Sequence, residues 1–311
     1  MSETTPMNPE LQLLPGAPEA TNRMYGIIVG YWASQIAGVL ARLQIPDRLA
    51  AQARTAEQLA QELDLDRDAL FRLLRAASAI DILDRDSDGA FALTQLGATL
   101  RADVPGSLRG LAATLTAPCH WLPWGRLEDA IRTGSSQASE ALAGHFFEYL
   151  AQHPAELSQF ADAMEELSSQ ISDEVAGSVD LSDARTVVDV GGGSGTLLAA
   201  VLARHPDVHG TILERPEMAA AARAMIADRG LQERCDVVEG DFFRAVPEAD
   251  VYLLKLIVHD WDDDHAAAIL RTCADSLRAG GRIVIIEALV PEDGSAPTEC
   301  GYRSRNREGY W

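Results

Sequence analysis

The chain has 311 residues, of which 47% are hydrophobic, and a formal net charge of −21. This length suffices for two hydrophobic cores, and the acidic excess argues against attraction to nucleic acid or to an anionic membrane surface. The four cysteines (Cys119, Cys235, Cys273 and Cys300) lack Cys-x-x-Cys spacing, which argues against structural zinc and fits a reducing, cytoplasmic compartment.

The amino-terminal segment combines a polar arm with a long uncharged stretch. Residues 1–20 contain four prolines and predict a mobile arm, and no charged segment followed by an apolar core marks a signal peptide. From Met24 to Ala41, 18 residues carry no formal charge, which is the lower limit for a membrane span. Glycines and polar residues dilute this stretch and no second span follows. We therefore predict a helix buried at a subunit interface.

Residues 55–97 predict a helix-turn-helix followed by a hairpin. A capped helix begins after Thr55, a second helix runs from Arg67 to Ala79, and the hairpin turns at Asp88-Gly89. This is the winged-helix pattern, which often binds DNA. Here the second helix mixes arginines with acids in a strongly acidic chain, so a DNA-binding regulator remains only a remote alternative.

A helix is predicted from Leu157 to Val175, ahead of the first strand of a sheet. Phe160, Met164 and Ser168 recur every four residues and therefore share one face of this helix. Such a stripe is usually ordinary core. Aromatic and sulfur-containing side chains also suit flat ring ligands, so a ligand-facing role stays open.

The stretch from Val187 to Gly195 predicts a strand, a sharp turn and a helix. An apolar run that carries Asp189 leads into glycines at 191, 192, 193 and 195, which allow the turn and a close approach of backbone to ligand. The dinucleotide fingerprint Gly-x-Gly-x-x-Gly would need glycine at position 196, which is threonine. The spacing therefore favours S-adenosylmethionine, which has no pyrophosphate, over NAD or a generic glycine turn.

Strands and helices alternate after this loop. Strands are predicted at 210–214, 235–240, 250–255 and 282–287, with helices at 216–229 and 263–278 and a turn at Gly280-Gly281. This alternation predicts a doubly wound parallel sheet whose ligands lie at the carboxyl ends of the strands. At those ends, Glu214 is placed to accept both ribose hydroxyls, and Asp241-Phe242 to meet the adenine amino group and ring face.

Four motifs in order resemble the S-adenosylmethionine-dependent small-molecule O-methyltransferases of the caffeic acid and acetylserotonin type. They are Asp-Val-Gly-Gly-Gly-Ser-Gly, Glu-Arg-Pro-Glu, Gly-Asp-Phe-Phe and Leu-Leu-Lys-x-x-x-His-Asp-Trp. Within that family, the chain is most similar to bacterial antibiotic-tailoring enzymes, over residues about 22 to 290. The resemblance implies a winged-helix dimerisation domain, a Rossmann-like methyltransferase domain, a homodimer and a small aromatic acceptor. We place the arm at 1–20, the dimerisation domain at 21–110, linking and acceptor-pocket helices at 111–180, and the methyltransferase domain at 181–311.

The resemblance also assigns roles to residues. In the family, Gly191, Glu214, Asp241, Phe242 and Lys255 match cofactor contacts, and His259 matches the general base. The full predicted cofactor set is Asp189, Gly191, Gly193, Gly195, Glu214, Asp241, Phe242, Lys255 and Ser168. The predicted acceptor set is Trp121, Trp124, Phe160, Met164 and Asp260.

A histidine suits this reaction for a reason independent of the family. The acceptor oxygen must lose its proton, and an imidazole with a pKa of ~6.5 can take it near neutral pH. The base needs an acidic neighbour at its other ring nitrogen, and the resemblance matches Glu287, at the end of the last strand, to one such residue. The acids at 262–264 are interpreted as the cap of the next helix rather than as metal ligands, and no metal is expected. A non-methylating homologue, such as a hydroxylase or decarboxylase, would leave His259 idle and is the second hypothesis.

The short carboxy-terminal segment predicts a sheet edge that differs from the one usual in the family. Only 24 residues follow Glu287, whereas the family's closing helix and strand pair need on the order of 50. Residues 292–311 show no helical or strand period. We therefore expect a truncated or altered end, an unpaired edge strand, a His259 steered by Glu287 alone, and weak methylation.

Overall fold

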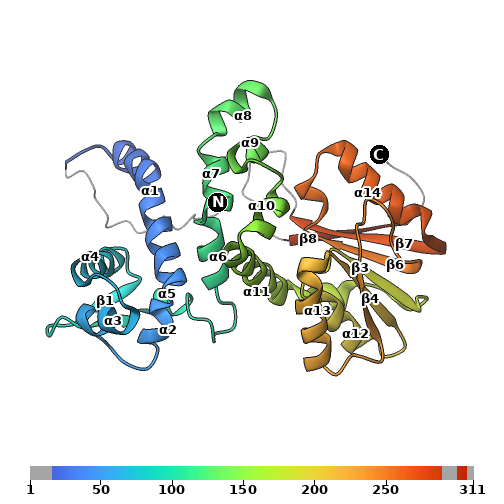
Figure 1. The fold of residues 1–311 in the computed structure, drawn as a ribbon, viewed down its shortest axis with the longest axis horizontal. Coiled ribbons are helices and arrows are strands. Elements are labelled where there is room, and N and C mark those ends of the chain that lie inside the picture. Colours follow the sequence, from blue (N-terminus) through green and yellow to red (C-terminus); the bar gives the residue numbers. More distant parts are fainter. Residues whose placement is uncertain (1–15, 289–299, 307–311) are drawn as a thin grey trace. The chain divides into compact units, whose positions relative to one another are not determined.

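The computed structural model describes residues 16–288 and 300–306. The chain divides into two compact units, residues 1–159 and 160–311 (Figure 1). The predicted mobile arm lies mostly outside the described residues; helix α1 begins at Glu19.

The first unit consists of helices and one small hairpin. Its elements are α1 (Glu19–Arg42), α2 (Ile45–Leu49), α3 (Ala56–Leu63), α4 (Arg67–Ser78), β1 (Leu83–Arg85), β2 (Phe91–Leu93), α5 (Gln95–Ala98), α6 (Arg109–Leu115), α7 (Pro118–Trp124), α8 (Leu127–Thr133), α9 (Ala138–Leu142) and α10 (Phe146–Gln152). Helix α11 (Pro154–Ser178) begins in this unit and continues into the second.

The predicted helix-turn-helix and hairpin are confirmed. Thr55 and Gln58 form a reciprocal capping box at the start of α3, with hydrogen bonds of 3.2 and 2.9 Å, which satisfies amide groups that a helix start leaves unpaired. β1 and β2 pair antiparallel, and the turn places Gly89 at a φ of +86°. Fully buried apolar side chains hold these elements together: Leu40, Ile45, Leu59, Leu74 and Phe91.

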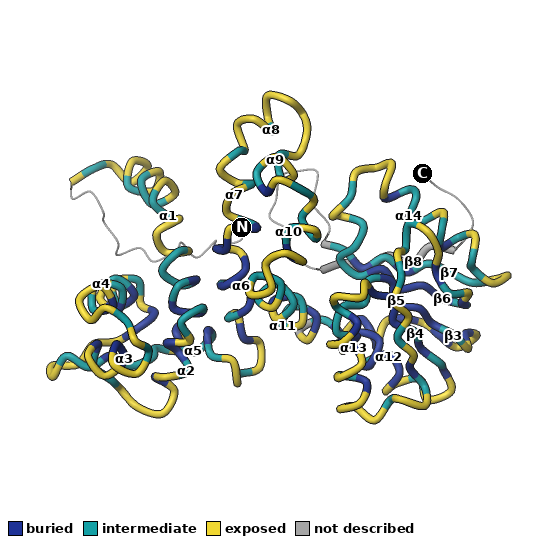
Figure 2. The backbone as a smooth tube through the Cα atoms, viewed as in Figure 1, coloured by how far each residue is buried: buried dark blue, intermediate teal, exposed yellow. Residues whose placement is uncertain are grey.

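Helix α1 is packed at one end and exposed at the other (Figure 2). Near its end it lies so close to α6 that a Cβ atom at Gly38 would fall 1.8 Å from Thr116 Oγ1. Its earlier turns leave large apolar side chains 50–65% exposed: Met24, Ile27, Ile28, Tyr31 and Trp32. Among the described residues it is the one helix long and apolar enough to cross a membrane. A single such helix is weak evidence for a span, because helices of soluble proteins can have the same length and composition.

The second unit is the predicted doubly wound sheet. Its elements after α11 are β3 (Thr186–Val190), α12 (Thr196–Arg204), β4 (His209–Glu214), α13 (Pro216–Asp228), β5 (Cys235–Glu239), β6 (Ala249–Lys255), the 3-10 turn η1 (Val258–Asp260), α14 (Asp263–Asp275), β7 (Leu277–Ala288) and β8 (Cys300–Asn306). The strand order is β5-β4-β3-β6-β7-β8, and the first five strands run parallel.

Neighbouring side chains of a strand point to opposite faces of the sheet, so this unit has two hydrophobic cores, one on each face. In β6, Val251 and Leu253 face α12 and α13, whereas Tyr252 and Leu254 face Ile269 of α14. Figure 1 shows α14 on the side of the sheet opposite α12 and α13. Because both faces of the sheet are covered, its strands are apolar on both sides.

Two features of the last strands correct the sequence predictions. Strand β7 begins at Leu277, so the predicted turn at Gly280-Gly281 is an irregularity within a strand, where the register against β6 shifts. Glycine is needed there because a Cβ atom at Gly281 would lie 2.6 Å from the carbonyl oxygen of Asp250.

The predicted unpaired sheet edge is also wrong. β8 pairs antiparallel with β7, from Arg282 opposite Asn306 to Ala288 opposite Cys300. An edge strand needs only backbone groups to pair, so a segment without an apolar pattern can take this place. The predictions for 292–299 and 307–311 lie outside the described residues.

Candidate functional site

The glycine-rich loop after β3 is shaped by close contacts. Gly191, Gly193 and Gly195 have φ values of +67°, +58° and +83°, which side chains other than glycine rarely adopt. A Cβ atom at Gly191 would lie 2.6 Å from Ile257 Cδ1, and one at Gly195 would lie 2.3 Å from Ile212 Cδ1. The loop therefore presents bare backbone at the carboxyl end of the sheet, as the motif predicts.

Glu214 is tied to this loop from the end of β4. Its Oε2 accepts a hydrogen bond of 2.7 Å from the Gly193 amide, and its Oε1 accepts one of 2.7 Å from the Arg215 amide. The side chain is buried, and burial raises its pKa against the lowering effect of these amides. A carboxylate held beside a glycine loop suits the hydroxyl groups of a ribose.

Asp189 lies below the loop and is 1% exposed. A Cβ atom at Gly192 would meet its carboxyl group at 2.8 Å. Its Oδ2 has no hydrogen-bond partner among the described residues. Burial raises the pKa of Asp189 to about 7, against the attraction of Lys255. A buried, unpartnered carboxyl oxygen beside a glycine cradle fits a cationic cofactor.

Lys255, at the end of β6, reaches helix α11. Its Nζ donates a hydrogen bond of 2.7 Å to Ser168 Oγ, which in turn donates to the carbonyl of Met164 at 2.5 Å. The structure thus brings the predicted cofactor residues Lys255 and Ser168 together.

Asp241 and Phe242 follow β5 at the same edge of the sheet. The Asp241 carboxylate accepts from the Phe243 amide at 2.9 Å. Phe242 lies next to the loop, since its Cε1 would be 3.7 Å from a Cβ atom at Gly191. Phe242 and Phe243 also pack edge-on against Trp261, with ring centroids 6.1 and 4.7 Å away. Three further residues of this region were not predicted as site residues, although they stand within or beside the recognised motifs: Phe243, Trp261 and the loop contact Ile257.

His259 sits on the turn after β6 with a carboxylate at each ring nitrogen. Nδ1 lies 2.5 Å from Glu287 Oε2, and Nε2 lies 3.3 Å from Asp260 Oδ1. Glu287 also accepts from the backbone amides of Val258 and His259, at 2.9 and 3.3 Å. Glu287 therefore fixes both the ring and the turn that carries it.

These contacts favour the protonated ring. The hydrogen bond with Asp260, and then that with Glu287, raises the pKa of His259 to about 10, against the effect of burial. Burial alone would raise the pKa of Glu287, but the hydrogen bond and charge of His259 hold it below its usual value. A ring protonated at both nitrogens accepts no proton, so a base role requires that an acceptor replace Asp260 at Nε2.

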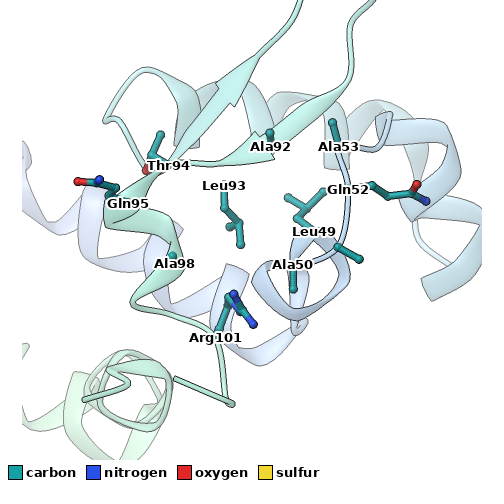
Figure 3. A pocket seen from close by; sticks show the side chains of 11 residues that line it. Leu49, Ala50, Gln52, Ala53, Ala92, Leu93, Thr94, Gln95, Ala98 and Arg101 are labelled. Atoms are coloured by element: carbon teal, nitrogen blue, oxygen red, sulfur yellow. The ribbon is translucent and has the colours of Figure 1, made fainter. Parts of the chain in front are cut away.

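The predicted acceptor residues lie in both units. Trp121 and Trp124, on α7, line an apolar cavity of about 490 Å³ in the first unit, together with leucines of α6. Phe160, Met164 and Asp260 belong to the second unit. A second hollow of about 360 Å³, shown in Figure 3, lies around β2 and α5 and contains none of the predicted site residues.

The acids at 262–264 begin a helix, as predicted. Asp262 caps α14 by accepting from the His265 amide at 2.9 Å. Across the described part of the chain, no group of three or more histidine, cysteine or acidic side chains is arranged to hold a metal ion. Cys119, Cys235 and Cys273 are free thiols.

Comparison with known proteins identifies the family. The O-methyltransferase domain matches residues 124–305, and the O-methyltransferase dimerisation domain matches residues 25–103. The chain belongs to the S-adenosylmethionine-dependent O-methyltransferases.

Individual relatives share most of the chain. Mitomycin biosynthesis 6-O-methyltransferase of Streptomyces lavendulae is 37% identical over 298 residues, which are 95% of this chain and 84% of the relative. The structure of the mitomycin 7-O-methyltransferase MmcR matches with a TM-score of 0.82 and 36% identity, over 88% of this chain and 81% of that one. An O-methyltransferase from neocarzinostatin biosynthesis, solved with S-adenosylmethionine and 2-hydroxy-5-methyl naphthoic acid, matches with a TM-score of 0.74 and 35% identity, over 83% and 80%.

Proposed function

We propose that this chain methylates a hydroxyl group of an aromatic or polyketide-like secondary metabolite, with His259 as the general base. The observation that carries the proposal is the His259–Glu287 contact of 2.5 Å at the sheet edge, in the same unit as the glycine loop and Glu214. Family membership supports the reaction class, and the relatives' names support the acceptor class.

Different residues would bind the cofactor and the acceptor. S-Adenosylmethionine, when bound, supplies an electrophilic methyl group on a sulfonium. Gly191, Gly193, Gly195, Glu214 and Asp189 would hold it with Asp241, Phe242, Lys255 and Ser168. Phe160 and Met164 of the second unit would contact the acceptor ring. Positioning of the two reactants accounts for much of the expected rate.

His259 then handles the proton. An acceptor hydroxyl that takes the place of Asp260 at Nε2 removes one carboxylate from the ring, which lowers the pKa of His259. The neutral ring would accept the hydroxyl proton at Nε2, which would leave the acceptor oxygen able to take the methyl group that the cofactor would supply. Glu287 keeps Nδ1 protonated and the ring in place.

A labelling experiment tests the activity. With methyl-labelled S-adenosylmethionine and a panel of phenols and naphthols, we expect label on an acceptor oxygen and one demethylated cofactor per product. Mass spectrometry of ligands that co-purify with the protein should guide the panel. A hydroxylated or decarboxylated product without label would instead support the non-methylating hypothesis.

We also propose that the active form is a homodimer built on helix α1, in the cytoplasm. The support is the dimerisation domain match over 25–103 and the exposed apolar face of α1, because faces of this kind mark interaction sites. In sedimentation experiments, Ile28→Glu with Trp32→Glu should convert a dimer into monomers. Ile131→Glu, on the exposed side of α8 (78% exposed), is the control and should leave the dimer intact. A wild-type monomer at micromolar concentration would contradict the proposal.

A further inference from the structure

Asp189 is a buried acid with one carboxyl oxygen that lacks a hydrogen-bond partner among the described residues. Its side chain is 1% exposed, and its Oδ2 has no hydrogen-bond partner within residues 16–288 or 300–306. A buried polar oxygen without a partner is unfavourable, because it has lost its hydrogen bonds to water and gained none from the protein. The carboxyl group also lies against the glycine loop, 2.8 Å from where a Cβ atom of Gly192 would stand.

The charged groups that act on Asp189 come from the neighbouring strands. Lys255 of β6 is the nearby cation, and its Nζ donates to Ser168. Glu214 of β4 repels Asp189, and both its oxygens are already held by backbone amides. Cys235 of β5 also interacts with Asp189, and burial and nearby acids raise the pKa of that thiol to about 12, so it stays neutral.

In these surroundings, a bound ligand can change the protonation state of Asp189. Burial raises its pKa to about 7, where the acid and the carboxylate are both populated near neutral pH. A cation in the loop would favour the carboxylate, because opposite charges attract strongly where water is excluded. S-Adenosylmethionine carries one positive charge more than its demethylated product, whose sulfur is a neutral thioether.

We propose that Asp189 discriminates the sulfonium cofactor from its product by charge, losing a proton to solvent when the cofactor binds and regaining one after methyl transfer. This role rests on the cofactor site proposed above. It makes Asp189 a positioning and selectivity residue rather than a catalytic one, since His259 takes the acceptor proton. The product carries no positive charge to pair with the carboxylate, so it gains nothing from an ionised Asp189 and is bound less tightly than the cofactor.

Calorimetry tests this inference directly. Cofactor and demethylated product are titrated into the full-length protein at pH 7 in two buffers of different ionisation enthalpy, which counts the protons released. With Asp189 half-protonated, we expect the cofactor to release up to about half a proton more than the product. The ratio of the product's Kd to the cofactor's Kd should also rise up to about tenfold per pH unit as Asp189 ionises.

Variants separate Asp189 from other titrating groups. Asp189→Asn should abolish the proton difference and flatten the pH dependence of the Kd ratio. Asp241→Asn changes an exposed acid of the same site. It should weaken the binding of both ligands and leave the difference in proton release between them unchanged. The measurements are repeated with His259→Gln, which removes any proton released by the ring. If Asp189→Asn does not fold, Lys255→Met is measured instead. Loss of the cation raises the pKa of Asp189, so the rise in the Kd ratio should shift to higher pH.

The outcomes are distinct. Equal proton release by the two ligands in the wild-type protein would overturn the inference and leave the proposed function intact. Persistence of the difference in Asp189→Asn, or an unmoved pH dependence in Lys255→Met, would also overturn it. Absence of any cofactor binding by the wild-type protein would instead contradict the proposed function.

Discussion

Replacing His259 with glutamine is expected to lower kcat by roughly 10²- to 10⁴-fold, the usual contribution of a general base, while cofactor affinity stays near the wild-type value. The ring has a carboxylate partner at Nδ1, Glu287 at 2.5 Å, and its second nitrogen lies on the side of Asp260. Steady-state kinetics with a neutral phenol, together with cofactor calorimetry, measures both quantities.

The pH dependence gives this prediction its control. Because the pKa of His259 is raised to about 10, the basic form of the free enzyme grows as pH rises, so kcat/KM should rise with pH. Asp260→Asn removes the leading cause of the shift and should move that rise to lower pH. Acceptors that are already ionised should lose less rate in His259→Gln. If the variant methylates a neutral phenol as fast as the parent, His259 serves the structure only.

Replacing Glu214 with alanine is expected to weaken cofactor binding by about 1.5–3 kcal/mol, the range for hydrogen bonds to charged groups, which is roughly 10- to 150-fold in Kd. The variant removes the carboxylate that is proposed to meet the ribose, and it also removes the acceptor of the Gly193 amide at 2.7 Å, so the loop loses a restraint. Calorimetry with S-adenosylmethionine gives the value.

Two comparisons sharpen this measurement. Glu214→Gln keeps one acceptor oxygen and should fall between alanine and the wild type. Glu217→Ala removes a half-exposed acid that lies 3.7 Å from Arg215, and a surface change of this kind should stay within about 0.5 kcal/mol. Unchanged affinity in Glu214→Ala would show that Glu214 does not contact the cofactor, and NAD binding of similar strength would contradict the cofactor itself.

Local patterns predict most of the second unit because its strands are apolar and end in distinctive residues. The glycines after Val190 and the acids at Glu214 and Asp241 all lie at the expected sheet edge. Strand β8 is different, because it pairs through its backbone and carries no apolar period. The start of β7 also differs from the prediction. Gly280 and Gly281 have the composition of a turn, but they lie within the strand.

The charge interactions and burial of the site residues are harder to predict from the sequence than the secondary structure is. The family resemblance indicates that His259 meets Glu287, but the additional approach of Asp260 to Nε2 depends on the backbone of the turn. Similarly, the motif identifies Asp189 as a site residue, whereas its burial and unpartnered oxygen follow from how β3 is enclosed by its neighbours. Such properties depend on several strands at once, so no single segment encodes them.

The hydrogen bond between Lys255 and Ser168 has a consequence for how the two ligands affect each other's affinity. Ser168 lies on α11 one turn beyond Met164 and two turns beyond Phe160, the residues expected to face the acceptor. A cofactor that draws Lys255 away from Ser168 frees that part of the helix, and an acceptor that shifts the helix acts back on the lysine. Coupling between two binding sites is reciprocal, so each ligand would change the affinity for the other by the same factor. Cooperativity between cofactor and acceptor would then arise from one shared contact.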